Sequence, residues 1–268
     1  MQSLPRLSIL RVERQGFCLH VTMDDPATRN AMSDTLVGEW EAVLDATADD
    51  RTLRAMVVRG ANGVFCAGAD LKNVDSPGSG GERDPAWLAN RRGGLFFRRM
   101  NEHPLAVVAV VEGPAIGGGM GLVCCADVVI CTPDARFALS ETSLGLVPAQ
   151  IAPYVVARLG IAAARRLTLT ASRFDGLEAL QLGLADYCVE SSEALAETLA
   201  TVLRGVERCA PEANALAKSL MLRCAYATPL DYVDLAADAF SACVAGQEGQ
   251  EGVRAFRERR PPNWVGPR

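Results

Sequence analysis

Two stretches of small residues, each placed after an apolar strand-like run, decide the fold of this sequence. They are Phe65-Cys66-Ala67-Gly68-Ala69-Asp70-Leu71-Lys72 and Gly113-Pro114-Ala115-Ile116-Gly117-Gly118-Gly119-Met120-Gly121. Small side chains let backbone N–H groups approach a ligand closely. The second stretch also opens an expected helix, and a helix N-terminus favours negative charge. One N–H group from each loop would form an oxyanion hole.

Other kinds of glycine-rich loop do not match the second stretch. A P-loop is excluded because no Gly-Lys-Ser/Thr follows it. A dinucleotide-binding fingerprint is excluded by the glycine spacing and by the absence of a suitably placed acidic residue. A tight strand-to-helix turn without a ligand is the structural alternative, and this stretch alone leaves it open.

Composition and charge limit the classes of protein to which the chain can belong. It has 268 residues, of which 49% are hydrophobic and 22% are charged, as in ordinary globular proteins. The net charge of −5 and the lack of a dense Lys/Arg run argue against a nucleic-acid partner. No apolar stretch reaches the roughly 18 residues of a membrane span. The first residues, Met1–Arg6, lack the layout of a signal peptide.

The cysteines and histidines argue against a metal or redox centre. Nine cysteines are scattered along the chain, mostly within apolar runs, and no C-x-x-C motif occurs. This pattern suits reduced, buried thiols in a cytoplasmic protein. His20 and His103 are the only histidines, so a zinc site or a histidine-based catalytic site is not expected. No metal and no cofactor are predicted.

Hydrophobic spacing predicts strands that alternate with helices. A hairpin is expected over Leu7–Glu13 and Phe17–Met23, and Ser33 is the expected N-cap of a helix that runs to about Ala46. Further strands are expected at 54–59, 105–111, 128–131 and 185–189, further helices at 86–102, 191–208, 212–227 and 230–245, and a flexible loop at 76–81. This order indicates an α/β fold with parallel pairing and a helical C-terminal third.

The two loops together resemble the oxyanion loops of the enoyl-CoA hydratase/isomerase family, also called crotonases. Further matching segments extend the resemblance over nearly the whole chain: Arg29–Ser33, Asp127, Phe137–Glu141, Ala179–Asp186 and Glu251–Phe256. The resemblance implies a ββα spiral core over 1–190 and a helical trimerisation region over 191–268. It also implies an acyl-CoA thioester substrate and a homotrimer or a dimer of trimers, a hexamer. Coenzyme A would enter as part of the substrate.

The resemblance also implies roles for individual residues. The N–H groups of Ala69 and Gly118 would hold the thioester oxygen, and Glu141 would be the catalytic acid–base group. The implied substrate and coenzyme A contacts are Arg29, Ala31, Cys66, Ala67, Asp70, Leu71, Gly117, Gly121, Gln150, Phe240 and Arg259. A basic cluster at 257–260 would suit phosphates. Helix packing and surface charge explain Phe240 and Arg259 equally well.

One departure from the family pattern bears on the substrate. The family's hydratases commonly carry a first glutamate where this chain has Gly121, and Glu141 matches the second. We expect the glycine to remove a charge and to open volume beside carbon three of the substrate. Together with Pro148-Ala149-Gln150-Ile151-Ala152-Pro153, it resembles bacterial hydratases of 3-branched glutaconyl-CoA esters. Gln150 would bind water or substrate, or stabilise the turn.

The resulting hypothesis is a hydratase, a carbon–oxygen lyase, that adds water to isohexenylglutaconyl-CoA in acyclic terpene catabolism. A 3-methylglutaconyl-CoA hydratase of leucine catabolism and a general enoyl-CoA hydratase or isomerase are the alternatives within the family. One retained glutamate is compatible with an isomerase. A non-catalytic relative that binds acyl-CoA or RNA is the alternative from another class. Glu141, the two intact loops and the negative net charge argue against it.

Overall fold

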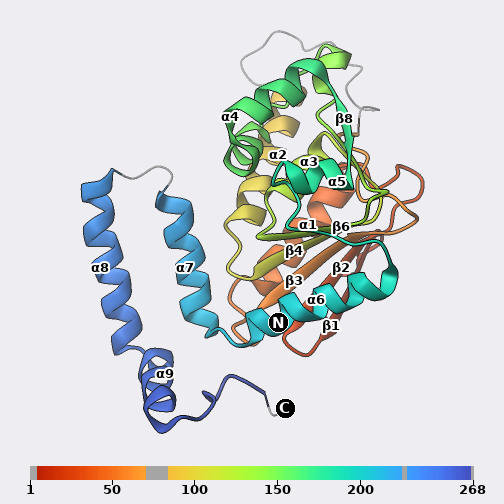
Figure 1. The fold of residues 1–268 in the computed structure, drawn as a ribbon. Coiled ribbons are helices and arrows are strands. Elements are labelled where there is room, and N and C mark those ends of the chain that lie inside the picture. The colour runs from red at the N-terminus through yellow and green to blue at the C-terminus, as the bar shows by residue number, and fades with distance from the viewer. Residues whose placement is uncertain (1–4, 71–83, 225–227, 267–268) are drawn as a thin grey trace.

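A six-stranded sheet forms the centre of the computed structural model, which describes residues 5–70, 84–224 and 228–266 (Figure 1). The strand order is β1-β2-β3-β4-β6-β9, in which β1 and β2 form an antiparallel hairpin and all other neighbours are parallel. The strands are β1 Leu10–Gln15, β2 Cys18–Met23, β3 Ala55–Gly60, β4 Ala106–Val111, β6 Val128–Cys131 and β9 Tyr187–Cys188. The predicted α/β class with parallel pairing is confirmed.

A second, three-stranded sheet was not predicted from the sequence. It consists of β5 (Pro114–Ile116), β7 (Arg136–Ala138) and β8 (Arg173–Asp175), in the order β5-β7-β8. Isolated parallel bridges continue its pairing from Cys66 to Ala115 and from Met32 to Ala69. Strands of three residues carry too little alternation for pattern analysis to detect. This small sheet carries the two predicted oxyanion loops.

Six helices surround the two sheets. They are α1 Asp34–Thr47, α2 Pro85–Asn101, α3 Gly118–Cys124, α4 Ala152–Thr170, α5 Gly176–Gln181 and α6 Ser192–Glu207. The predicted N-cap is confirmed, since Ser33 Oγ accepts the Leu36 N–H. The larger core contains the buried side chains of α1, α2 and α3, while Leu195 and Leu199 of α6 pack on the other face of the sheet.

The last three helices form an arm beside the core. They are α7 Pro211–Cys224, α8 Pro229–Ala245 and α9 Gln247–Glu258, and Figure 1 shows α7 and α8 standing apart from the sheets. α8 packs against α7 and α9. Lys218 anchors α7 to the core, because its Nζ bonds to Asp127 Oδ2 at 2.7 Å and to the Leu105 carbonyl at 3.2 Å. The division of the chain at residue 190 stays a prediction.

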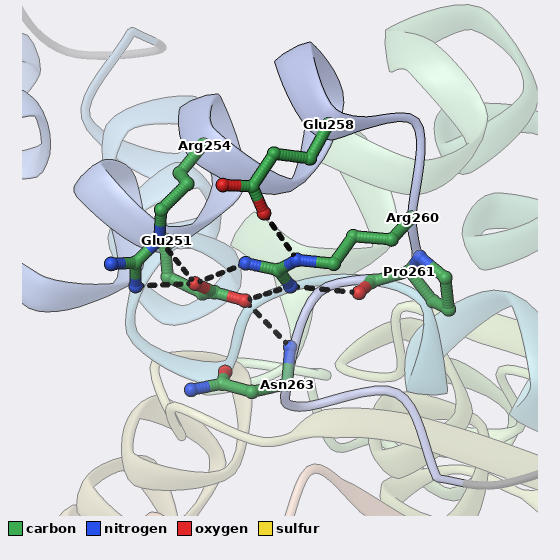
Figure 2. A network of polar contacts seen from close by, with 6 residues as sticks. All are labelled: Glu251, Arg254, Glu258, Arg260, Pro261 and Asn263. Carbon is green, nitrogen blue, oxygen red and sulfur yellow. Dashed lines mark hydrogen bonds and ion pairs between the residues drawn. The ribbon is translucent and has the colours of Figure 1, made fainter.

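A buried carboxylate ties the end of the chain to α9 (Figure 2). Glu251 accepts hydrogen bonds from the side chains of Arg254 and Arg260 and from the Asn263 N–H. The bonds from Arg260 and Arg254 lower the pKa of Glu251 to about 2. Arg260 also pairs with Glu258, so its guanidinium is already engaged. The expected basic cluster at 257–260 therefore loses one of its arginines.

The cysteines are free thiols, and five of them are buried: Cys18, Cys66, Cys124, Cys125 and Cys131. Burial raises the pKa of the Cys66 thiol to about 12, so this thiol, which lies in the first oxyanion loop, stays protonated. Cys209 and Cys224 are exposed, so the predicted burial of the cysteines does not extend to these two. No helix in the described part of the chain is long and apolar enough to span a membrane. The loop expected at 76–81 lies outside the described residues.

Candidate active site

Backbone hydrogen bonds hold the two oxyanion loops side by side. The N–H groups of Phe65 and Cys66 both donate to the Pro114 carbonyl at 3.0 Å, and the Ile116 N–H donates to the Cys66 carbonyl at 3.0 Å. The Ala67 N–H donates in turn to the Arg29 carbonyl at 3.1 Å. Residues from three distant parts of the chain thus meet in one strip of backbone.

Glycine is required at three places in this strip. Gly68 has a φ of +101° and Gly117 a φ of +52°, a region that side chains disfavour. A Cβ on Gly119 would lie 2.5 Å from the Cys66 carbonyl oxygen, so the loops could not approach as closely with any other residue there. Close approach of the backbones explains the glycine-rich sequence and sets the geometry of the site.

The backbone nitrogens of Ala69 and Gly118 face the same small volume. A Cβ built on Gly118 would lie 4.0 Å from Ala69 N. Within the described part of the chain, neither N–H donates to another residue, although the neighbouring Gly68 carbonyl accepts the Met32 N–H at 2.7 Å. Gly118 is the first residue of α3, where N–H groups have no partner inside the helix. The pair can therefore donate to one ligand oxygen.

Glu141 brings a carboxylate to the same place. It begins a 3₁₀ turn, Glu141–Leu144, just after β7. Its Oε1 lies 2.8 Å from the position of a Cβ on Gly117, so the carboxylate rests on the second oxyanion loop. Its Oε2 is buried and has no hydrogen-bond partner among the described residues. Burial raises the pKa of Glu141 above its ordinary value, which suits a group that takes up and returns a proton.

Gly121 does not open the volume that the sequence led us to expect. A Cβ at this position would lie 2.2 Å from Cγ2 and 2.7 Å from Cβ of Ile151, and 3.4 Å from the Phe97 ring. Ile151 is only 3% exposed. The space of a missing side chain is therefore filled by a side chain from another segment. Glycine at this position still lacks the negative charge of a glutamate, as expected from the sequence.

Gln150 faces α2 rather than the oxyanion pair. Its amide nitrogen donates to Asn90 Oδ1 at 2.8 Å, and its Oε1 lies 2.2 Å from the position of a Cβ on Gly94. This contact ties the segment before α4 to α2, and both roles considered for Gln150 stay predictions. The next residue, Ile151, was not predicted as a site residue, because an aliphatic side chain carries no sequence signal of binding or catalysis.

A cavity of about 620 Å³ opens beside the first oxyanion loop. Its charged lining consists of three arginines from separate segments and two carboxylates: Arg29, Arg136 and Arg173, with Asp175 and Glu178. Ala67 also lines it. Arg136 is oriented by hydrogen bonds to the carbonyls of Pro133 and Ala135. Arg29 was expected to bind the substrate, whereas Arg136 and Arg173 were not. Arg136 and Arg173 are the exposed first residues of β7 and β8, and these two short strands were not predicted from the sequence.

The remaining predicted residues lie in three different settings. Ala31 is buried next to the loop, and the Asn30 side chain fixes it by donating to the Val64 carbonyl at 2.8 Å. Leu71 lies outside the described residues, and Asp70 is the last residue before that gap. Phe240 is 71% exposed on α8, and Arg259 is exposed at the end of α9. A single chain thus does not bring Phe240 and Arg259 to Glu141.

The chain matches the family model described as enoyl-CoA hydratase/isomerase over residues 13–267. It is 31% identical to the enoyl-CoA hydratase EchA19 of Mycobacterium tuberculosis, with 94% of this chain and 95% of that protein covered. Two solved structures superpose with a TM-score of 0.92. One is an enoyl-CoA hydratase/isomerase from Marinobacter aquaeolei (40% identity; 96% and 99% covered), and the other is Pseudomonas aeruginosa AtuE (46%; 97% and 100%).

The fold and these matches define the class. The chain belongs to the enoyl-CoA hydratase/isomerase family and has the mixed α/β crotonase fold with C-terminal helices. It is an enoyl-CoA hydratase, a carbon–oxygen lyase that acts on acyl-CoA substrates. The family resemblance found in the sequence is confirmed.

Proposed function

We propose that this hydratase adds water to a 3-branched 2-enoyl-CoA, with isohexenylglutaconyl-CoA as the substrate. One observation supports the chemistry most directly: Glu141 Oε2 is buried without a hydrogen-bond partner among the described residues, and its carboxylate rests on the loop that carries Gly118. The N–H groups of Gly118 and Ala69, which lie close together, are likewise without an acceptor in that part of the chain. A thioester oxygen bound by the two N–H groups would place its α,β-double bond beside the carboxylate.

The proposed reaction needs a single acid–base group. Glu141 takes a proton from water, whose oxygen adds to carbon three of the enoyl group. The electron pair of the double bond moves to the thioester oxygen, and the N–H groups of Ala69 and Gly118 stabilise the enolate. Glu141 then returns the proton to carbon two, which completes the addition of one water molecule. The raised pKa of Glu141 serves the first step, because it makes the carboxylate a stronger base toward water, and a pKa nearer the working pH lets the same group return the proton in the second step.

The choice of a branched glutaconyl ester is supported by sequence similarity and by charge. Of the two positions at which the family's hydratases commonly carry a glutamate, this chain has a glutamate only at 141, because position 121 is glycine. A substrate with a second carboxylate therefore meets less repulsion. The segment Pro148–Pro153 resembles the hydratases of such esters. A 3-methylglutaconyl ester, with a shorter branch, is the nearest alternative substrate.

Double-bond isomerisation is a second candidate reaction, and the single glutamate supports it. An isomerase needs one base to move a proton between carbons two and four, and Glu141 satisfies that requirement. The two reactions differ in their products, because hydration consumes water and yields a 3-hydroxyacyl ester. Mass spectrometry of the product in H₂¹⁸O separates them directly.

Coenzyme A is proposed to place its phosphates in the arginine-lined cavity. The thioester end is held at Ala69, and Ala67 of the same loop lines the cavity. Among the described residues, neither Arg29 nor Arg173 has a hydrogen-bond or ion-pair partner on its guanidinium group. Guanidinium groups bind phosphate oxygens well, and this chain is otherwise acidic.

A homotrimer, or a dimer of trimers, is the proposed assembly. The arm exposes large apolar side chains, among them Leu230 at 78%, Phe240 at 71% and Phe256 at 84%. Exposed apolar surface of this kind marks a protein interface. A second copy would cover these side chains and would bring Phe240 and Arg259 to a neighbouring active site.

A substrate panel tests the proposed function. The purified protein is given crotonyl-CoA, a longer straight-chain 2-enoyl-CoA, 3-methylglutaconyl-CoA and isohexenylglutaconyl-CoA, and kcat/KM is measured for hydration of each. We expect the highest value for isohexenylglutaconyl-CoA. A value for crotonyl-CoA at least equal to it would overturn the substrate, and no hydration of any ester would overturn the reaction.

A further inference from the structure

Two residues 30 positions apart in the chain share one side-chain volume next to the oxyanion pair. The Cβ that Gly121 lacks would overlap Cγ2 of Ile151 at 2.2 Å, a separation that real atoms do not reach. We propose that Ile151 is the specificity-determining residue of the acyl pocket, and that Gly121 and Ile151 act as a coupled pair. This inference rests on the proposed function.

The position of this pair places it near the reacting carbons. Gly121 follows Gly118 by three residues on α3, a rise of about 4.5 Å along the helix. The Phe97 ring spans that interval, since it lies 3.7 Å from a Cβ on Gly118 and 3.4 Å from one on Gly121. Carbon three of a substrate held at Gly118 therefore lies within reach of the wall that Phe97 and Ile151 form.

The structure holds Ile151 firmly in that wall. Ile151 is the N-cap residue of α4, and its carbonyl accepts the N–H groups of Tyr154 and Val155 at 3.1 and 3.0 Å. The preceding residue, Gln150, is bound to Asn90 on α2. The backbone of Ile151 is thus held by α4 and the preceding side chain is bound to α2, so a movement of Ile151 away from position 121 would break these hydrogen bonds.

The chemistry of the wall selects the substituent that lies against it. Ile151 and Phe97 are buried and offer hydrocarbon only, so a carboxylate placed there would lose its hydration without gaining a partner. A hydrocarbon branch on carbon three fits instead, and its second carboxylate must point elsewhere. Ile151 sets how long that branch can be, because the pocket shortens or deepens with its side chain.

The first test changes the depth of the pocket. Ile151→Ala is compared with wild type on a series of 2-enoyl-CoA esters whose branch on carbon three lengthens by one carbon at a time. Leu167→Ala is the matched control, because Leu167 is also buried but lies on α4 beyond the kink at Gly160. We expect the ester with the highest kcat/KM to move to a longer branch by one or two carbons, with a roughly tenfold change in the ratio to crotonyl-CoA.

The second test measures the coupling of the pair. Gly121→Glu alone should lower the melting temperature strongly, since the new side chain meets Ile151. Ile151→Gly removes the overlapping atoms, and glycine is well tolerated at an N-cap. We expect Gly121→Glu with Ile151→Gly to be more stable than Gly121→Glu alone, and to favour crotonyl-CoA over branched esters.

The outcomes separate this inference from the proposed function. If the wild type hydrates none of the esters, the proposed function fails. If the wild type hydrates them and Ile151→Ala shows the same substrate ratios as Leu167→Ala, Ile151 does not determine specificity. If the change in melting temperature of the double variant equals the sum of the changes in the two single variants, the pair is not coupled.

Discussion

The carboxylate of Glu141 rests on the backbone of Gly117, with Oε1 2.8 Å from where a Cβ of residue 117 would stand. The proposed acid–base group and the proposed oxyanion loop are therefore in direct contact. The Gly117 N–H is fixed at 2.8 Å to the Ala138 carbonyl, which precedes Glu141 by three residues. The position of the Glu141 carboxylate and the shape of the loop therefore depend on each other.

Gly117→Ala should damage catalysis through this contact. The methyl group would push the Glu141 carboxylate aside, and a φ of +52° would strain the backbone. We expect kcat to fall by roughly 10²-fold or more, because small displacements of a catalytic group have large effects. Gly205→Ala on α6, where a Cβ meets nothing within 4 Å, is the control. Steady-state hydration kinetics check the prediction, and equal rates in both variants would contradict it.

Glu141→Gln should abolish hydration while binding of the coenzyme A ester stays nearly intact. The amide keeps the shape of the side chain but cannot accept the proton of water. A loss of roughly 10²-fold or more in kcat is expected, with the dissociation constant for a substrate ester changed by only a few-fold. Glu197→Gln on the exposed face of α6 is the control. Turnover within a few-fold of the wild type would contradict the assignment of Glu141 as the acid–base group.

The same substitution should stabilise the protein at neutral pH. Burial raises the pKa of Glu141 above 4.5, so the folded state holds this proton more tightly than the unfolded state. Stability from this group is therefore present at low pH and is lost as the pH rises through the folded pKa. Glu141→Gln removes this pH-dependent loss of stability, because glutamine does not ionise. Thermal unfolding should give a higher melting temperature than wild type at pH 8, and a difference that vanishes below about pH 4.5.

Arg136→Gln and Arg173→Gln should weaken binding of the nucleotide end of the substrate. Loss of one charge-assisted hydrogen bond to phosphate costs roughly 1.5 kcal/mol, or about tenfold in KM. The same variants should leave kinetics unchanged on a pantetheine thioester, which lacks the nucleotide. Arg204→Gln, on α6, is the control. Equal changes for both esters would mean that the cavity does not hold the phosphates.

Substitutions in the arm should weaken assembly. Phe240→Ser replaces an exposed aromatic side chain of α8 with a small polar one, so folding of the single chain should be little affected. We expect wild type to sediment as a trimer or hexamer at micromolar concentration and the variant to shift toward the monomer. Glu193→Gln, on α6, serves as the control. A wild-type monomer at that concentration would contradict the proposed assembly.

Much of the fold could be predicted because its signals are local. Ser33 marks the start of α1, and the apolar run 105–111 marks β4, since caps and buried strands depend on neighbouring residues. α9 was missed because its many charged residues hide the narrow apolar face. The three short strands were missed because their pairing joins distant segments. The resemblance to crotonases supplied the spiral arrangement, which pattern analysis does not distinguish from a doubly wound sheet.

The candidate site was only partly accessible from the sequence. The two loops and Glu141 stand out by residue type, and their backbone geometry follows from the glycines. The overlap between Gly121 and Ile151 could not be foreseen, because the distance between their side chains is decided by how α3 and α4 pack. The same holds for Arg136 and Arg173, whose common cavity exists only once β7 and β8 are paired.

The exposed side chains of α8 also affect the newly made chain. In the single chain, Leu230, Val233 and Phe240 face water on a helix that packs against α7 and α9. If the proposed trimer forms, each newly synthesised chain passes through a period in which assembly with other copies competes with aggregation. The yield of active protein on refolding should therefore pass through a maximum as the protein concentration rises. Below the optimum the chains are too dilute to assemble, and above it they precipitate.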